Sequence, residues 1–299
     1  MKKGFSLLRH RNDKQQQIAL ILKKAGNETA QICRCLSLAP STFYYRIKHR
    51  ACKLMNTRLE IAIKSIHNEM DGIYGKRRML VELVKKGFKL GLDKVRRLMR
   101  KLGLVAKRPK QHSYPRGGKS SLLAPNHLNR QFNPATINRY WSGDITYIRS
   151  RQGWLYLAVV MDLCSRRIVG WAFSEKPNSL LTVKALNMAI QRRKGECPTL
   201  FHCDQGIQYR SEQFQQLLSY HQITFSMSRA GNCLDNAVTE RFFRSLKSER
   251  INYRDYITRE QAMGDIIDYI EPIYNQKRRH YKLGFISPAE FEHNLLKTA

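Results

Sequence analysis

The first candidates for chemistry are two acidic residues in one short stretch. Residues 232–243 read NCLDNAVTERFF and hold Asp235 and Glu240 in front of a pair of phenylalanines. A helix over this stretch, at 100° per residue, would place Glu240 on the side opposite an apolar stripe made of Val238, Phe242 and Leu246. Asp235 precedes that helix and is better suited to cap it. The pattern therefore favours Glu240 for chemistry and a structural role for Asp235.

Two aspartates lie in segments that are typical of strands. Asp144 lies within YWSGDITYIRS (140–150), and Asp204 ends TLFHCD (199–204). Strand alternation places Asp144 on the face of Thr146 and Asp204 on the face of His202, away from the apolar neighbours. Open α/β sheets bind ligands at the carboxyl ends of their strands. Both aspartates are therefore expected to point out of the core together.

Three carboxylates that converge on one point would repel one another and raise one another's pKa unless a cation lay between them. Hard oxygen ligands favour Mg²⁺, with Mn²⁺ as a substitute. Two such ions can activate an attacking hydroxyl and stabilise the leaving oxygen in an in-line displacement at phosphorus. Lys247 lies seven residues after Glu240 on the same helix face, where it would hold a nearby phosphate. The set predicts hydrolysis or transesterification of a nucleic-acid backbone.

The elements that must position these residues follow a recognisable order. Three β-branched and aromatic runs joined by the short links RQG and CSR predict an antiparallel meander. Strands are expected at 140–150, 154–163, 167–175, 199–204 and 223–228, and helices at 179–194, 211–221 and around Glu240. This order makes a mixed sheet with helices on its faces. The predicted fold class is α/β, a ribonuclease H-like mixed sheet preceded by all-α helix-turn-helix regions.

The composition indicates a partner with many negative charges. The chain of 299 residues has 54 Lys and Arg against 23 Asp and Glu, a net charge of +31. Residues 1–132 carry 31 basic and 7 acidic residues, so the excess is concentrated in the front half. The longest apolar run, WLYLAVVM (154–161), is too short to span a membrane, and the apolar stretch near the N-terminus is too short for a signal peptide.

The front half contains two helical groups. In ETAQICRCLSLAPSTFYYRIK (28–48), a break at 37–40 separates two short helices, the second capped by Ser41, in helix-turn-helix geometry. Further helices are expected at 59–70, 76–86 and 92–104. The last of these would bury Val95, Leu98, Met99 and Leu102, end at Gly103, and face outward with Arg96, Arg97, Arg100 and Lys101. This basic face either contacts DNA or is a solvated surface.

The predicted organisation has four parts. Residues 1–52 form a helix-turn-helix-like region, 53–106 a second such region that binds DNA, 107–134 a basic linker, and 135–299 a ribonuclease H-like catalytic core with a C-terminal helical extension. The linker is rich in Pro, Gly, Ser and Lys.

Several other polar residues have structural explanations. Asp162 stands where a strand enters the CSRR turn and is expected to cap it. His202 either touches the site or has a hydrogen-bonded packing role. Arg278, Arg279 and His280 either bind phosphate or cover the core.

Motifs spread over the chain together resemble one known family. The order Asp144, Asp204, thirty-five residues, Glu240 and then Lys247 is similar to the DDE signature of retroviral integrases and bacterial insertion-sequence transposases. HCDQGIQY (202–209), SMSRAGNCLDNAVTERFFRSLKSE (226–249) and YNQKRRHYKLGFISPAEFE (274–292) resemble the OrfB transposase of the IS-three family. LAPSTFYYR (38–46) and IYGKRRM (73–79) match its helix-turn-helix regions. Cys203, Thr239 and Arg241 depart from residues frequent in the family, and none of them replaces a carboxylate.

The resemblance implies roles and partners. Asp144, Asp204 and Glu240 would be the catalytic metal ligands for Mg²⁺ or Mn²⁺, and Lys247 would contact the terminal DNA of the element. The residues expected to contact DNA are Lys247, Arg244, Arg77, Arg78, Arg96, Arg97, Arg100 and Lys101. The implied partners are double-stranded DNA (terminal inverted repeats and target DNA), the upstream OrfA product or a fusion with it, and further copies of the chain in a synaptic complex. The implied location is the bacterial cytoplasm, at the nucleoid.

The implied function is DNA transposition of an insertion sequence, by strand cleavage at the ends and strand transfer from the freed 3′ hydroxyl. Two rivals remain: a nuclease of the same fold that hydrolyses without joining, and a catalytically idle DNA-binding protein that represses transposition. Strand-transfer products would distinguish a transposase from the nuclease. Loss of a carboxylate would mark the second, and all three are present.

Overall fold

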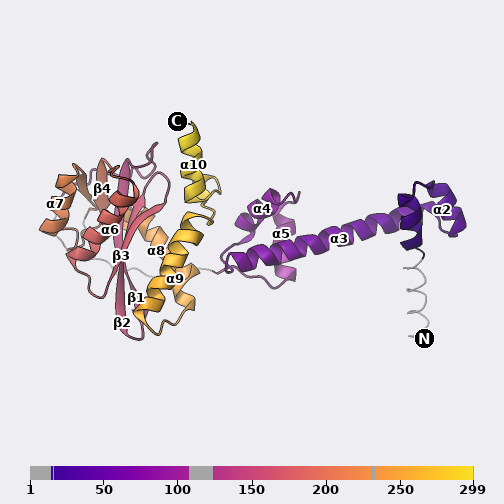
Figure 1. Cartoon of the computed structure of the whole chain (residues 1–299), viewed down its shortest axis with the longest axis horizontal. Coiled ribbons are helices and arrows are strands. Elements are labelled where there is room, and N and C mark those ends of the chain that lie inside the picture. The colour runs from indigo at the N-terminus through magenta and orange to yellow at the C-terminus, as the bar shows by residue number, and fades with distance from the viewer. Residues whose placement is uncertain (1–14, 16, 108–123, 230–232, 299) are drawn as a thin grey trace. The chain divides into compact units, whose positions relative to one another are not determined.

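The computed structural model describes residues 15, 17–107, 124–229 and 233–298, without the side chains of 46–53, 233, 234 and 298 (Figure 1). The chain divides into two compact units: residues 1–71 with 82–104, and residues 72–81 with 105–299. We call the first the helical unit and the second, which contains the candidate catalytic carboxylates Asp144, Asp204 and Glu240, the catalytic unit. Within the described residues no helix is long and apolar enough to cross a membrane.

The helical unit has a small core at its N-terminal end. A helix at 17–24 and α2 (Thr29–Cys35) pack with the start of α3 (Pro40–Glu69) around Ala19, Ile32, Cys33 and Phe43. The expected break between 48 and 59 is wrong, because α3 runs unbroken for 30 residues. The expected cap at Ser41 is also wrong: Ala39 is the N-cap, and Pro40 supplies the first helical position, where its missing N–H costs nothing. The boundary expected at 52/53 lies inside this helix.

The remaining helices of the front half follow the expected pattern. α4 (Lys76–Lys85) and α5 (Leu92–Lys101) are short and amphipathic. In α5, Val95 and Met99 are buried and Leu98 is half-buried, as the spacing predicts. Gly103 has φ +67°, a left-handed conformation that ends the helix cheaply because glycine has no Cβ.

The catalytic unit is built on a five-stranded mixed sheet in the order β3-β2-β1-β4-β5. β1 (Tyr140–Ser150), β2 (Gly153–Asp162) and β3 (Ile168–Ser174) form the expected antiparallel meander. β4 (Leu200–Cys203) and β5 (Thr224–Met227) add in parallel on the side of β1. The fold class predicted from the sequence is therefore confirmed. Asp162 caps the turn after β2, as predicted, by accepting hydrogen bonds from the backbone N–H groups of Cys164 (2.8 Å) and Ser165 (3.1 Å).

Helices cover both faces of the sheet (Figure 1). On one face, α6 (Ser179–Arg192) and α7 (Glu212–Tyr220) enclose the main core, whose largest side chains include Trp141, Phe201, Tyr209 and Phe214. On the other, α8 (Ala237–Glu249) packs on β1, and α9 (Arg259–Asp268) packs on β1 and β2. The chain ends with a π-helical segment, Tyr269–Asn275, and α10 (Pro288–Thr298).

Close contact between β3 and α6 depends on a glycine. A Cβ at Gly170 would lie 2.3 Å from the carbonyl oxygen of Ala185 and 2.8 Å from the Cβ of Ala189. We expect Gly170→Ala to lower the free energy of unfolding by about 1–3 kcal/mol, since backbone atoms must move apart. The three tryptophans lie in β1, β2 and β3, so denaturant unfolding followed by tryptophan fluorescence reports on this unit.

Gly264→Ala is the matched control. Gly264 lies inside α9, and a Cβ there would meet nothing within 4 Å. The control should leave stability unchanged or raise it by about 0.5–1 kcal/mol. Equal stability of the two variants would contradict the close packing of α6 on β3.

Candidate active site

Strand register brings the two aspartates together. In the parallel pair of β1 and β4, Ser142 stands opposite His202. Two residues further along each strand are Asp144, within β1, and Asp204, directly after β4. Both lie on the sheet face that α8 covers, because Ser142 on that face contacts α8. The expectation that the aspartates share a face is thus met.

A buried polar contact fixes α8, and with it Glu240, on β1. The hydroxyl of Ser142 donates to Oδ1 of Asn236 at 2.7 Å and lies 2.7 Å from the hydroxyl of Thr239. Nδ2 of Asn236 donates to the carbonyl of Gly143 at 3.3 Å. Asn236 and Thr239 lie just before Glu240 in the chain, so these contacts hold the Glu240 carboxylate near Asp144 of β1 with little freedom.

The three carboxylates influence one another. Burial raises the pKa of Asp144 well above its ordinary value, and the charges of Asp204 and Glu240 raise it further. Desolvation by surrounding protein also raises the pKa of Asp204. The pKa of Glu240 is raised by burial and by Asp204, while Arg244 opposes the rise. The site thus holds an excess of negative charge that a cation would relieve.

The donor set suits a hard divalent cation, because carboxylate oxygens are the ligands that Mg²⁺ and Mn²⁺ prefer. Within the described part of the chain, however, no three His, Cys, Asp or Glu side chains are grouped closely enough to form a metal shell. To share an ion, Asp144, Asp204 and Glu240 would therefore have to move closer together.

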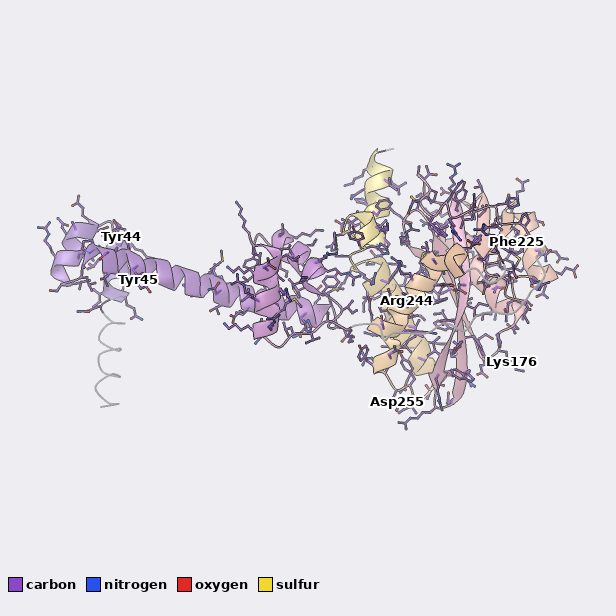
Figure 2. The ribbon with its side chains drawn as sticks, turned by 180° about the vertical axis from the view of Figure 1, so that it is seen from behind. Tyr44, Tyr45, Lys176, Phe225, Arg244 and Asp255 are labelled. Carbon is purple, nitrogen blue, oxygen red and sulfur yellow. The ribbon has the colours of Figure 1, made fainter. Side chains whose placement is uncertain are left out.

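Lys247, on α8, lies near the carboxylate of Asp144. Its pKa is lowered by burial, and the charge of Asp144 opposes this. Its Nζ lies 4.7 Å from the ring centroid of Tyr147 on β1, a cation–π contact that sequence reasoning missed. The alternation of β1 gave no signal for it, since Tyr147 was assigned to the opposite face. Arg244, exposed on the same helix, is labelled in Figure 2.

His202 has the packing role that was one of its two expected roles. Its Nδ1 lies 2.9 Å from the hydroxyl of Ser226 and its Nε2 lies 3.2 Å from that of Ser228. Burial lowers its pKa to about 4. The neutral ring of His202 therefore links β4 to β5 and to the residue after β5, close to Asp204 in the chain.

The expected cap at Asp235 is wrong. The α8 N-cap is Asn236, without a side-chain cap, and Asp235 is fully buried in the preceding 3-10 turn. Its carboxylate accepts hydrogen bonds from the guanidiniums of Arg229 and Arg130 and from Nδ2 of Asn126. The hydrogen bonds from Arg229 are the first of the causes that hold its pKa well below the usual range. Asp235 therefore anchors the segments that lead into α8.

A second buried carboxylate at the other end of α8 was missed. Glu249 accepts hydrogen bonds from Arg278 (2.7 and 2.8 Å) and from the hydroxyl of Tyr269 (2.6 Å). Burial raises its pKa, but the charge and hydrogen bonds of Arg278, together with Arg78 and Tyr269, outweigh burial, and the net pKa is lowered. Arg78, an expected DNA contact within the catalytic unit, lies 3.6 Å from the same carboxylate. Its neighbour Arg77 is exposed.

The basic face of α5 is largely open, within the helical unit. Arg96, Arg97 and Arg100 are exposed. Lys101 is also exposed, but its Nζ lies 2.7 Å from Oε1 of Glu60 on α3. Tyr44 and Tyr45 near the start of α3 are exposed as well (Figure 2). The helical unit therefore presents cations and aromatic rings to solvent.

Known protein families match most of the chain from residue 55 onward. The integrase core domain family matches residues 135–233, a second family of that description matches 240–296, and the HTH-like domain family matches 55–112. The three carboxylates fall in the first two segments.

Individual relatives extend the match over most of the chain. Transposase InsF for insertion sequence IS3A of Escherichia coli is 36% identical over 89% of this chain and 94% of its own length. The uncharacterized 31 kDa protein of insertion element IS600 of Shigella sonnei is 35% identical over 87% of this chain and 97% of its own. A solved HTLV-2 integrase catalytic core domain in complex with magnesium covers 52% of this chain and 96% of its own, with 19% identity and a TM-score of 0.40.

The buried position of Asp235 yields a test. We expect Asp235→Asn to destabilise the catalytic unit by about 1–3 kcal/mol, because the buried side chain would lose the charge that pairs it with Arg229 and Arg130. The carboxylate's pKa is lowered by folding, so its contribution is present above the unfolded value and is lost as the pH falls below about 4. The stability difference between the two proteins should therefore shrink in acid, as measured by urea unfolding at several pH values.

Asp255→Asn is the control, because Asp255 is exposed and pairs with exposed Arg151 (Figure 2). No change in stability is expected there. If the two variants behaved alike at neutral pH, Asp235 would not be the anchor of α8.

Proposed function

Because the chain belongs to the IS-three family of insertion-sequence transposases, we propose that Asp144, Asp204 and Glu240 are its catalytic carboxylates and hold two divalent cations, Mg²⁺ or Mn²⁺. The function is DNA transposition: metal-dependent cleavage of a strand at the element ends, followed by transfer of the freed 3′ hydroxyl to another phosphodiester. The observation that supports the assignment is that the register of β1 with β4 and the docking of α8 on β1 bring the three carboxylates close enough for the charge of Asp204 to raise the pKa of both Asp144 and Glu240.

The chain's own residues would act by position and charge. Asp144 would offer an oxygen ligand from β1 and Asp204 one from the end of β4. Glu240 would offer a third from α8, which is hydrogen-bonded to β1. Bound divalent ions supply activation of the attacking hydroxyl and charge stabilisation at the leaving oxygen. Lys247, steadied by the ring of Tyr147, would hold a non-reacting phosphate next to the carboxylates.

DNA contacts are proposed for both units. In the catalytic unit, Arg244 and Lys247 stand on the Glu240 face of α8, and Arg77 is exposed. In the helical unit, the exposed arginines of α5 offer phosphate contacts. We assign Arg78 a smaller share than Arg77, because Glu249 already attracts it.

The remaining partners follow from the family. We propose that the ends are terminal inverted repeats, that OrfA or a fusion with it contributes to their recognition, and that at least two protomers act together on two ends. The place of action would be the bacterial cytoplasm, at the nucleoid. The strongly basic composition supports a nucleic-acid partner.

Glu240→Gln tests the catalytic assignment. The amide keeps the shape of the side chain but removes a charged metal ligand, so cleavage and joining should fall by about a thousandfold or more. Binding to the ends should be unchanged. Products would be scored on a plasmid carrying both element ends, with cleaved strands and end-to-end junctions measured separately.

Glu212→Gln, at the exposed start of α7, is the control and should retain activity. Cleavage without junctions in the unmutated protein would make the chain a nuclease. Full activity of the Glu240 variant would remove Glu240 from the site.

Single Arg→Ala changes at Arg96, Arg97 and Arg100 test the α5 face. Each removed phosphate contact should reduce the slope of log affinity against log salt by about 0.9. Lys101→Ala should reduce it less, since Glu60 holds that ammonium. Fluorescence anisotropy with duplex DNA over a salt series measures both, and an unchanged slope in every arginine variant would make α5 a solvated face.

A further inference from the structure

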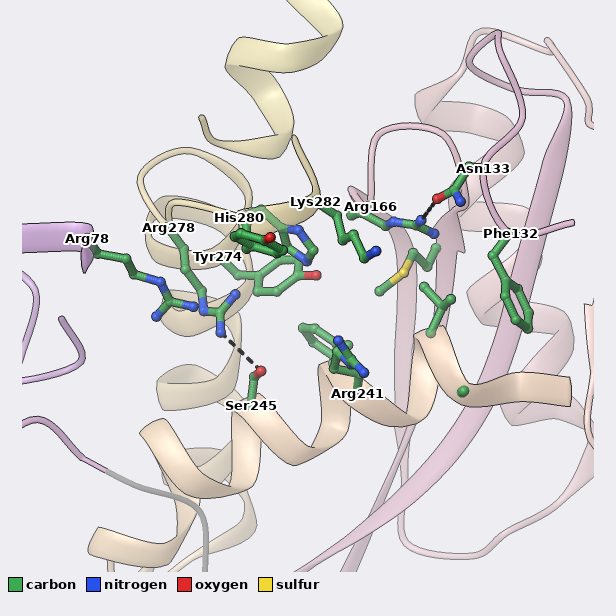
Figure 3. A pocket seen from close by; sticks show the side chains of 15 residues that line it. Arg78, Phe132, Asn133, Arg166, Arg241, Ser245, Tyr274, Arg278, His280 and Lys282 are labelled. Atoms are coloured by element: carbon green, nitrogen blue, oxygen red, sulfur yellow. Dashed lines mark hydrogen bonds between the residues drawn. The ribbon is translucent and has the colours of Figure 1, made fainter. Parts of the chain in front are cut away.

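A basic pocket lies on the side of α8 that faces away from the carboxylates. It is a pocket of about 400 Å³ within the catalytic unit (Figure 3). Val238, Phe242 and Ser245 line it from α8, on the side of the helix opposite the row of Glu240 and Lys247. Its cationic lining comes from Arg78, Arg166, Arg241, Arg278 and Lys282. One helix thus separates this basic pocket from the carboxylate site.

The cations around this pocket have too few counter-charges. Glu249 serves both Arg278 (2.7 Å) and Arg78 (3.6 Å). Among the described residues, no carboxylate forms an ion pair with Arg241 or Lys282. Of the five cations, only Arg278 and Arg78 therefore form ion pairs, both with the same carboxylate, an arrangement that favours an anion from outside.

Arg166 shows the deficit most clearly. It is only 5% exposed, and its side-chain partner is the neutral amide oxygen of Asn133 (Figure 3). Its Nη1 is buried without a hydrogen-bond partner. A buried guanidinium normally has a counter-ion and satisfied N–H groups, because removing it from water is costly. This lining group therefore has an unfilled bonding position beside the cavity.

The backbone holds Arg166 in place. Its φ is +62°, a left-handed conformation that is unfavourable for a residue other than glycine. The turn is kept by Asp162, whose backbone carbonyl accepts from the N–H of Arg166 at 2.9 Å and whose side chain caps the next residues. Arg166 is consequently pre-positioned at the pocket.

His280 adds a neutral polar group to the same wall. Its Nδ1 is buried without a partner. Burial, followed by the charges of Arg278 and Arg166, lowers its pKa to about 3. The ring is thus neutral at pH 7 and offers either a donor or an acceptor to a ligand beside the guanidiniums.

The remaining walls are apolar and aromatic. Phe132, Met161, Val238, Phe242, Tyr274 and Tyr281 contribute them. A cavity of this size suits one small organic ligand and is too narrow for a duplex. Arginines beside aromatic rings are the combination that holds single nucleotides, with the phosphate on the cations and the base on a ring.

We propose that this pocket binds one unpaired nucleotide of a DNA strand, with its phosphate held by Arg166, Arg241 and Lys282 and its base against Phe132 or Tyr281. The identity of the strand rests on the proposed function. The pocket would hold a nucleotide displaced from the duplex while the carboxylate site acts on another phosphate.

Photo-crosslinking of the full chain tests this directly. The probe is a short 5′-phosphorylated single strand that carries 5-iodouracil at its first base, irradiated without added divalent metal. Mass spectrometry locates the crosslinked residue. The expected result is attachment to Phe132 or Tyr281, with the yield falling at least tenfold in Arg241→Gln and Lys282→Gln. Both residues are exposed, so these variants should fold normally.

Lys184→Gln is the control of equal charge change, because Lys184 is exposed on α6, across the sheet. It should leave the crosslink unchanged, and so should Glu240→Gln, which separates this proposal from failure of the catalytic assignment. Crosslinks only outside the pocket would overturn the proposal. The proposal would also be overturned if the strand gave no crosslink while thymidine monophosphate bound in the pocket, because the pocket would then take a free nucleotide.

Discussion

The docking of α8 on β1 is the contact on which the proposed catalytic centre depends. Three carboxylates near one another are favourable only with a cation between them, and they repel in its absence. The hydrogen bonds of Ser142 with Asn236 and Thr239, buried under the helix, hold Glu240 beside the sheet against that repulsion. A buried polar contact of this kind also fixes the register, because a shift of the helix would leave its donors and acceptors unsatisfied.

Each end of α8 is tied down by a buried carboxylate. Asp235 binds Arg229 and Arg130 before the helix begins, and Glu249 binds Arg278 where it ends. The C-terminal segment is therefore part of the catalytic unit's framework. Glu292 of α10 extends this, since it accepts from the hydroxyl of Ser165 in the turn that also holds Arg166. The face with Glu240 and the face with the basic pocket thus share one set of supports.

Much of the fold could be predicted because its signals are local. The alternation of β1 fixed its limits to the residue, and the short links RQG and CSR predicted the meander. The spacing of carboxylates, together with the family resemblance, predicted Asp144, Asp204 and Glu240 as the catalytic set, and the structure places them near enough for Asp204 and Glu240 to affect the pKa of Asp144. The length of α3 was missed because its middle is polar and has no apolar stripe, so local periodicity suggested a break that the backbone does not make.

What could not be predicted depends on partners distant in sequence. Asp235 looks like a cap until Arg130, 105 residues earlier, is seen beside it. Glu249 looks like a surface residue of a helix end until Arg278 and Tyr269 enclose it. The sequence showed that Arg278 and His280 were basic, but only the tertiary structure distinguishes a salt bridge from an open phosphate site. Charge count alone therefore did not locate the basic pocket.

The most direct measurement is the anomalous X-ray scattering of crystals grown with Mn²⁺. We expect Mn²⁺ to be bound by the carboxylates of Asp144, Asp204 and Glu240, at roughly 2 Å from oxygen. Mn²⁺ peaks elsewhere in the chain, with these three carboxylates free of metal at saturating concentration, would contradict it.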